Sequence, residues 1–156
     1  TLEGREKRLK KAIDSVRADF DYILIDCPPS LGILTINSLT AVDSVLIPIQ
    51  CEFYALEGVS QLISTIELVK TNMNPDLYIE GVILSMFDGR TNLCQQVVEE
   101  VRKFFGPAMY DTVIPRNVRL AEAPSYGVPI ITYDPKAAGA KAYFEFTEEF
   151  VAREKK

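Results

Sequence analysis

Two kinds of hydrophobic pattern alternate along the chain: short runs that are apolar at nearly every position, and longer stretches in which apolar residues recur every three or four positions. The run 20–25, Phe-Asp-Tyr-Ile-Leu-Ile, is typical of a strand, whereas Leu62, Ile66 and Val69 share one face of a helix. The predicted strands are 20–25, 45–49, 78–86 and 112–114. The predicted helices are 2–17, 33–42, 56–70, 93–105 and 137–152, and segment 128–133 is predicted to be extended.

The order of these elements predicts an α/β fold with a mostly parallel sheet. The strands are apolar throughout, which is typical of strands that are covered on both faces. Helices alternate with strands, and right-handed crossovers then place helices on both faces of the sheet. In such a sheet, ligands bind beyond the carboxyl ends of the strands. The candidate site therefore consists of the segments that follow the predicted strands, namely 26–30, 50–54, 87–92 and 115–124.

Composition narrows the chemistry that these segments can perform. The 156 residues fit one domain (1–156), and no apolar run approaches the roughly 20 residues of a membrane span. Histidine is absent, which excludes histidine general bases, Ser-His or Cys-His nucleophiles and histidine metal ligands. The three cysteines (Cys27, Cys51 and Cys94) match no metal-site spacing, and their odd number argues against a disulfide framework. The net charge of −5 does not indicate a nucleic-acid binder, so any such surface must be local.

The first candidate segment is Asp-Cys-Pro-Pro-Ser at 26–30. Asp26 ends a predicted buried strand, where nucleotide-hydrolysing enzymes place a carboxylate that holds magnesium, often through a water. Pro28 and Pro29 stiffen the exit from the strand, which favours the functional interpretation. The structural alternative is an aspartate that ends a strand and caps a turn.

Two further segments carry polar groups just before a predicted helix. In 50–54, Gln50 and Glu52 either face a ligand or a partner subunit, or belong to a solvated loop. In 87–92, Thr91 or Asn92 is expected to cap the helix. Arg90 then stands near the helix amino end, where phosphate is favoured, or is an ordinary surface arginine.

The last segment, 115–124, begins with a rigid proline. Pro115 is suited to lie flat on an adenine ring, with Arg116 and Asn117 reaching the edge of the ring and Arg119 pointing away from it. The alternative is a capped short helix without a ligand.

Six motifs occur in a fixed order along the chain. They are Asp-Cys-Pro-Pro-Ser-Leu-Gly (26–32), Pro-Ile-Gln-Cys-Glu (48–52), Ala-Leu-Glu-Gly (55–58), Asp-Gly-Arg-Thr-Asn (88–92), Ile-Pro-Arg-Asn-Val-Arg-Leu-Ala-Glu-Ala-Pro (114–124) and Tyr-Asp-Pro (133–135). Each motif is weak alone, but the ordered set is highly specific and resembles the ParA/Soj chromosome- and plasmid-partition ATPases. These ATPases belong to the deviant Walker-type P-loop group that also contains MinD.

The resemblance implies a nucleotide site. Asp26 matches the catalytic Walker B acid of the family, which supports magnesium through a water. Pro115, Arg116 and Asn117 match the stretch that meets the adenine of ATP. The implied cofactors are therefore ATP and magnesium.

The resemblance also implies a working cycle on DNA. Arg90 and Arg119 match arginines that the family uses for sequence-independent DNA binding. Proteins of this family form an ATP-dependent sandwich homodimer and coat the nucleoid in the cytoplasm. They release DNA when a ParB- or Spo0J-type partner stimulates hydrolysis, and no membrane partner is expected.

One departure from the family pattern is large. Gly-x-x-x-x-Gly-Lys-Ser/Thr does not occur in these residues, and Gly139-Ala140-Lys141 lacks the loop glycines and the preceding strand. That loop supplies most of the phosphate grip through its backbone N–H groups and its lysine. We therefore expect the chain to be the carboxy-terminal portion of a P-loop ATPase domain, without the first strand and the P-loop. We expect this polypeptide alone neither to hydrolyse ATP nor to hold it tightly.

Two other interpretations compete with this one. A MinD-like membrane-cycling ATPase needs a basic amphipathic tail, but the last predicted helix carries Glu145, Glu148 and Glu149, and Lys155 and Lys156 do not offset them. A non-enzymatic binding or dimerisation remnant is consistent with the absent loop. The presence of Asp26 and of the stretch 115–117, which is expected to meet adenine, argues against such a remnant.

Overall fold

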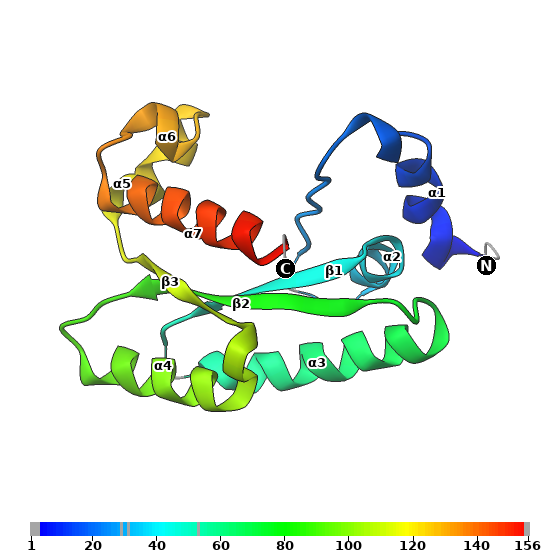
Figure 1. The fold of residues 1–156 in the computed structure, drawn as a ribbon, viewed down its shortest axis with the longest axis horizontal. Helices are drawn as coiled ribbons and strands as arrows, with labels where there is room; N and C mark the ends of the chain where they lie inside the picture. Colours follow the sequence, from blue (N-terminus) through cyan, green and yellow to red (C-terminus); the bar gives the residue numbers. More distant parts are fainter. Residues whose placement is uncertain (1–3, 29, 31, 53, 155–156) are drawn as a thin grey trace. The chain divides into compact units, whose positions relative to one another are not determined.

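A parallel sheet of three strands, in the order β1-β2-β3, forms the framework of the chain and confirms the predicted α/β class (Figure 1). The structure is a computed structural model and describes residues 4–28, 30, 32–52 and 54–154. The strands are β1 (Ser44–Gln50), β2 (Tyr78–Phe87) and β3 (Met109–Pro115). The α-helices are α1 (Arg8–Asp14), α2 (Ile33–Ala41), α3 (Ala55–Asn72), α4 (Asn92–Phe105), α5 (Val118–Glu122), α6 (Ile130–Tyr133) and α7 (Ala138–Glu154). The 3₁₀ turns are η1 (Arg5–Lys7), η2 (Arg17–Asp19), η3 (Gly106–Ala108) and η4 (Ala123–Tyr126).

The chain divides into two compact units. The first comprises Thr1–Val45 and Glu57–Glu80, and the second comprises Leu46–Leu56 and Gly81–Lys156.

In the second unit the sheet lies between α7 on one face and α4 on the other (Figure 1). The consecutive residues Val82, Ile83 and Leu84 are all buried, because a strand between two helical layers buries both of its faces. On the α7 side the core contains Ile83, Tyr110, Ile114 and Ala142, with Leu46, Leu120, Phe146 and Phe150 packed around them. On the α4 side the helix buries Cys94, Val97 and Val101.

Close packing in this core requires a glycine at position 81. A Cβ atom there would lie 2.4 Å from Cε2 of Tyr110 and 2.8 Å from the carbonyl oxygen of Ala108. Both separations are far inside van der Waals contact, so β2 and β3 approach each other only because Gly81 has no side chain.

In the first unit, one buried amide side chain joins two helices. Asn74 follows α3, and its Nδ2 donates hydrogen bonds to the carbonyl oxygens of Leu39 (3.0 Å) and Val42 (2.8 Å) at the end of α2. The last carbonyl groups of a helix have no partners within the helix, so a side-chain donor there satisfies them. Asn74 therefore fixes the end of α2 as well as the turn after α3.

Two predictions about local structure are wrong. Segment 20–25 forms no strand, and Phe20 and Leu24 are 61% and 88% exposed. An apolar run becomes a strand only beside another strand that satisfies its backbone groups, and in the described part of the chain none pairs with it. Segment 128–133 is not extended but forms the short helix α6, because the N–H groups of Thr132 and Tyr133 both reach the Pro129 carbonyl oxygen (2.9 Å each). A proline directly before a helix is preset for its first turn.

Candidate functional site

The carboxyl ends of the three strands meet at one edge of the second unit, as the parallel sheet predicts. Phe87 at the end of β2 is in register with Pro115 at the end of β3. The backbone N–H of Arg116 donates to the carbonyl oxygen of Phe87 (2.9 Å), and that of Cys51, just after β1, donates to the carbonyl oxygen of Ser85 (2.9 Å). Three of the four predicted segments are therefore brought to this edge.

A cluster of charged side chains occupies this edge. Arg90 binds the Asp88 carboxylate through Nε (2.9 Å) and Nη2 (2.7 Å), and its backbone N–H also donates to Asp88 Oδ1 (3.1 Å). Arg116 Nη2 lies 3.4 Å from Glu52 Oε1. The side-chain and backbone hydrogen bonds from Arg90, with a smaller contribution from the charge of Arg116, lower the pKa of Asp88 to about 2. Asp88 is therefore ionised at any physiological pH, and it raises the pKa of Arg90 in return.

Arg90 stands directly before the first turn of α4. Thr91 is the N-cap of this helix, since its Oγ1 accepts a hydrogen bond from the backbone N–H of Cys94 (3.3 Å). The expected cap is thus confirmed at Thr91 rather than Asn92. The Arg90 side chain is 89% exposed, so it is accessible to a large anionic ligand beside a helix amino end.

Asn117 caps a short helix, as the structural alternative for its segment proposed. Its Oδ1 accepts a hydrogen bond from the backbone N–H of Arg119 (2.9 Å) at the start of α5. Arg119 in turn binds Glu122 Oε2 through Nη1 (2.8 Å) and lies 3.6 Å from Asp134 Oδ2. Tyr133 donates its hydroxyl to the same Glu122 oxygen (3.2 Å). Both arginines that the sequence singled out for phosphate contact are thus half to mostly exposed and paired with carboxylates.

Asp26 lies in the first unit. The buried strand expected before it does not form, and Asp26 is exposed at the end of the segment that lacks a strand partner. The prediction that Asp26 ends a buried strand is therefore wrong, and Pro29 lies outside the described residues. Residues 115–117 belong to the other unit, so the proximity of Asp26 to the adenine-side stretch stays a prediction.

Magnesium is compatible with a single carboxylate. Among the described residues, no group of three or more His, Cys, Asp or Glu side chains gathers into a metal cage. Magnesium bound to a nucleotide is usually held by one or two carboxylates, by waters and by phosphate oxygens rather than by such a cage. Asp26 alone fits that pattern, with its carboxylate open to solvent.

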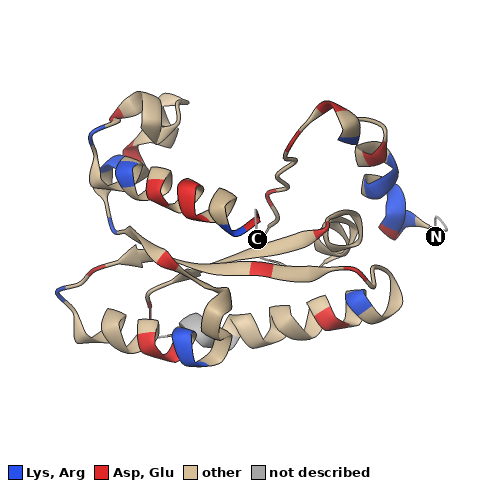
Figure 2. Cartoon of the chain, in the orientation of Figure 1, with Lys and Arg blue, Asp and Glu red and all other residues tan. Residues whose placement is uncertain are grey.

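A local concentration of positive charge occurs in the first unit and was not singled out from the sequence. Five of the seven residues 5–11 are Lys or Arg, and Figure 2 shows them along η1 and α1. Counting charges over a short window of the sequence would have found this stretch, whereas the net charge of the whole chain is negative and does not indicate it.

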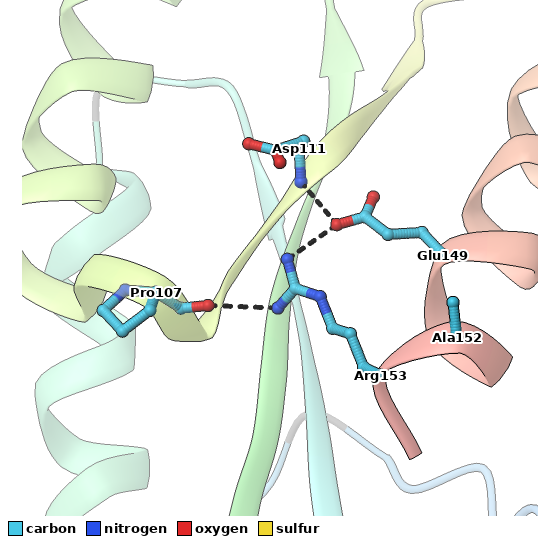
Figure 3. Close-up of a pocket in the computed structure, with 5 residues that line it drawn as sticks. All are labelled: Pro107, Asp111, Glu149, Ala152 and Arg153. Carbon is cyan, nitrogen blue, oxygen red and sulfur yellow. Dashed lines mark hydrogen bonds and ion pairs between the residues drawn. The ribbon is translucent and has the colours of Figure 1, made fainter. Parts of the chain in front are cut away.

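A pocket in the second unit is a structural contact between β3 and α7. Pro107, Asp111, Glu149, Ala152 and Arg153 line it, and Figure 3 shows the side chains of Glu149 and Arg153 directed toward each other and toward backbone atoms of Asp111 and Pro107. Glu149 and Arg153 of α7 are joined at 2.6 Å, and Arg153 also donates to the carbonyl oxygen of Pro107 (3.1 Å). The side chains of Glu149 and Arg153 thus use their hydrogen bonds to hold α7 against β3 and the turn before it.

The fold and the site at the carboxyl edge of the sheet define an α/β protein of the P-loop NTPase-like class. A cobyrinic acid a,c-diamide synthase from Mycobacterium smegmatis, solved with a bound ATP analogue and magnesium, matches with a TM-score of 0.79 and 38% identity. The match covers 94% of this chain and 54% of that one.

The chain belongs to the ParA/Soj family of chromosome-partitioning ATPases, and the family model described as an AAA domain matches residues 1–79. It is 62% identical over 149 residues to the sporulation initiation inhibitor protein Soj of Bacillus subtilis, covering 96% of this chain and 59% of that protein. It is 55% identical over 152 residues to the chromosome partitioning protein ParA of Myxococcus xanthus, covering 97% of this chain and 54% of that protein. The chain thus spans just over half the length of these relatives.

None of the helices in the described part of the chain combines the length and the apolar character needed to cross a bilayer.

Proposed function

We propose that this chain is part of an ATPase that partitions a chromosome or plasmid by cycling on and off DNA. The observation that carries the proposal is the similarity to Soj and to a chromosome partitioning ParA over 96% and 97% of the chain. In this proposal the protein binds ATP with magnesium, dimerises, binds DNA without sequence specificity and hydrolyses ATP when a ParB-type partner stimulates it. Its place in the cell is then the cytoplasm, on the nucleoid.

The nucleotide would lie at the carboxyl edge of the sheet. Pro115 supplies a flat apolar surface for adenine, and Arg116 is tied to the adjacent strand by its backbone N–H. The helix cap uses the amide oxygen of Asn117, which leaves its amide nitrogen as the donor toward the ring nitrogens of adenine. Asp26 would support the magnesium ion, which neutralises charge on the phosphates during hydrolysis.

The 156 residues contain no Gly-x-x-x-x-Gly-Lys-Ser/Thr motif, so we expect them to be inactive on their own. Phosphate release with MgATP should be at background for the purified 156-residue chain. The same assay on the gene product that carries these residues should show turnover that Asp26→Ala abolishes. Turnover by the isolated chain would contradict the expected dependence on the missing loop.

The proposed DNA contacts are Arg90 and Arg119. Affinity for a DNA duplex of arbitrary sequence should be measured by fluorescence anisotropy over a salt series, with the gene product that carries this chain and with MgATP present. Each lost phosphate contact lowers the slope of log affinity against log salt by about 0.9. We expect a reduction of that size for Arg90→Ala and again for Arg119→Ala.

Arg102→Ala is the control, because Arg102 is about as exposed as Arg119 and is also paired with a carboxylate, Asp111, at 3.4 Å. It should leave the slope unchanged. If the double variant Arg90→Ala/Arg119→Ala binds DNA like the parent, the assignment of these two arginines fails. The basic stretch 5–11 would then be the next surface to test.

A further inference from the structure

The Arg90 side chain is highly exposed but is held by two hydrogen bonds to one carboxylate. The Arg90 side chain is 89% exposed, yet its Nε and Nη2 atoms are both held by the Asp88 carboxylate at 2.9 and 2.7 Å. A guanidinium group has five N–H donors in a planar fork, and a carboxylate that binds two of them fixes the plane of the fork. The donors on Nη1 are not used by Asp88 and are available to a phosphate.

Asp88 is itself firmly anchored. It follows the last residue of β2, and its side chain is only 20% exposed. Its carbonyl oxygen accepts hydrogen bonds from the backbone N–H (3.1 Å) and from the hydroxyl (3.0 Å) of Thr91, the N-cap of α4. The positive charge of Arg116, on the neighbouring strand end, also acts on the carboxylate. The backbone of Asp88 is therefore fixed relative to both the sheet and α4, and its mostly buried side chain has little room to move.

The ion pair contributes little to folding stability. The Arg90 side of the pair is largely exposed, and ion pairs that water reaches are screened and stabilise proteins only weakly. The same geometry has a larger effect on binding, because an unrestrained arginine must lose rotamer freedom when it contacts a ligand. In this structure that freedom is already restricted before any ligand arrives.

We propose that Asp88 is a positioning residue for DNA binding, which presents the free donors of Arg90 to a backbone phosphate. This inference rests on the proposed role of Arg90 in DNA binding. For the loss of the Asp88 charge, this inference predicts a change in DNA affinity opposite in sign to the change that electrostatic repulsion alone predicts. Removing a negative charge near a polyanion should strengthen binding if charge alone matters, whereas it should weaken binding if Asp88 positions Arg90.

The decisive variant is Asp88→Asn, measured by DNA anisotropy with MgATP in the gene product that carries this chain. We expect about three- to tenfold weaker DNA binding, the range for losing the preorganisation of one long side chain. The salt slope should stay near that of the parent, because Arg90 still reaches the phosphate. Asp111→Asn is the matched control, since Asp111 is 82% exposed and undergoes the same change of charge. It should leave affinity unchanged or slightly increased.

A double-mutant cycle tests whether Asp88 acts through Arg90. In an Arg90→Ala background, Asp88→Asn should cause no further weakening. Weakening of the same size in both backgrounds, or tighter binding by Asp88→Asn in the parent, would overturn the proposal. If Arg90→Ala alone has no effect, the proposed DNA contact fails instead, so the two failures are distinguishable.

A second variant keeps the proposal testable if Asp88→Asn unfolds, which circular dichroism would show. Arg90→Lys keeps the positive charge and leaves Asp88 unchanged, but an ammonium group cannot be gripped at two fixed donors. It should weaken binding about as much as Asp88→Asn with little change in salt slope. Parent-like affinity in Arg90→Lys would show that charge alone suffices and would refute the positioning role.

Discussion

The carboxylate of Glu149 offers a quantitative test of how α7 is held to the sheet. Its Oε1 accepts hydrogen bonds from the backbone N–H of Asp111 (2.9 Å) and from Arg153 (2.6 Å), as Figure 3 shows. Its Oε2 accepts a hydrogen bond from the backbone N–H of Thr112 (2.9 Å). These N–H groups lie where β3 departs from regular pairing with β2, since one residue of β2 (Ile83) is opposed by three residues of β3 (110–112) between the pairs Val82↔Met109 and Leu84↔Val113. A side chain of α7 thus supplies acceptors that a regular strand partner would supply.

Glu149→Ala should destabilise the protein by about 2–3 kcal/mol. Each hydrogen bond to a charged group contributes about 1.5–3 kcal/mol, so the two bonds from β3 would sum to about 3–6 kcal/mol. The expected loss lies at or below the lower end of that sum, because water replaces some of the lost acceptors at this partly exposed position. At about 2–4 °C per kcal/mol for a chain of this size, the melting temperature should fall by about 5–10 °C.

Glu148→Ala is the control, because Glu148 is the preceding residue of the same helix and is exposed. It should change stability by less than about 0.5 kcal/mol. Thermal unfolding followed by circular dichroism gives both values, and amide hydrogen exchange by NMR gives the protection of Asp111 and Thr112. Equal melting temperatures for the two variants, or undiminished protection of those amides in Glu149→Ala, would refute the reasoning.

Three further predictions concern pH, thiol reactivity and packing. Partial burial of Glu149 opposes its ionisation, but the hydrogen bonds from β3 outweigh this effect and lower the pKa of the carboxyl group. The stability that the ionised Glu149 contributes is therefore complete above about pH 4.5, and it is lost as the pH falls through the lowered pKa. The melting-temperature gap between the parent and Glu149→Gln should therefore narrow in acid. Burial raises the pKa of Cys51 to about 11, so a thiol reagent at pH 8 should modify the exposed Cys27 rapidly and Cys51 only after unfolding. Gly81→Ala should cost about 1–3 kcal/mol in urea denaturation because its Cβ would overlap the Tyr110 ring; parent-like stability would contradict the close approach of the strands.

The hydrophobic pattern predicted most of the helices and strands, because burial imposes a period on each segment. The expected strands 45–49 and 78–86 correspond to Ser44–Gln50 and Tyr78–Phe87, and helix 93–105 corresponds to Asn92–Phe105. The predicted strand at 20–25 was wrong, because the segment is apolar but has no neighbouring strand to pair with among the described residues. Such a partner is a property of the fold rather than of the segment.

The amino-acid sequence by itself determined the family, the class of fold and the segments that gather at the carboxyl edge of the sheet, because these follow from local motifs and from periodicity. Only the tertiary structure decided which side chains from distant parts of the chain meet. Asp88 lies beside the charge of Arg116, and Glu149 reaches β3 across 37 and 38 residues of chain. Pairing between such distant positions depends on how helices and strands pack, and no local pattern of residue types encodes it.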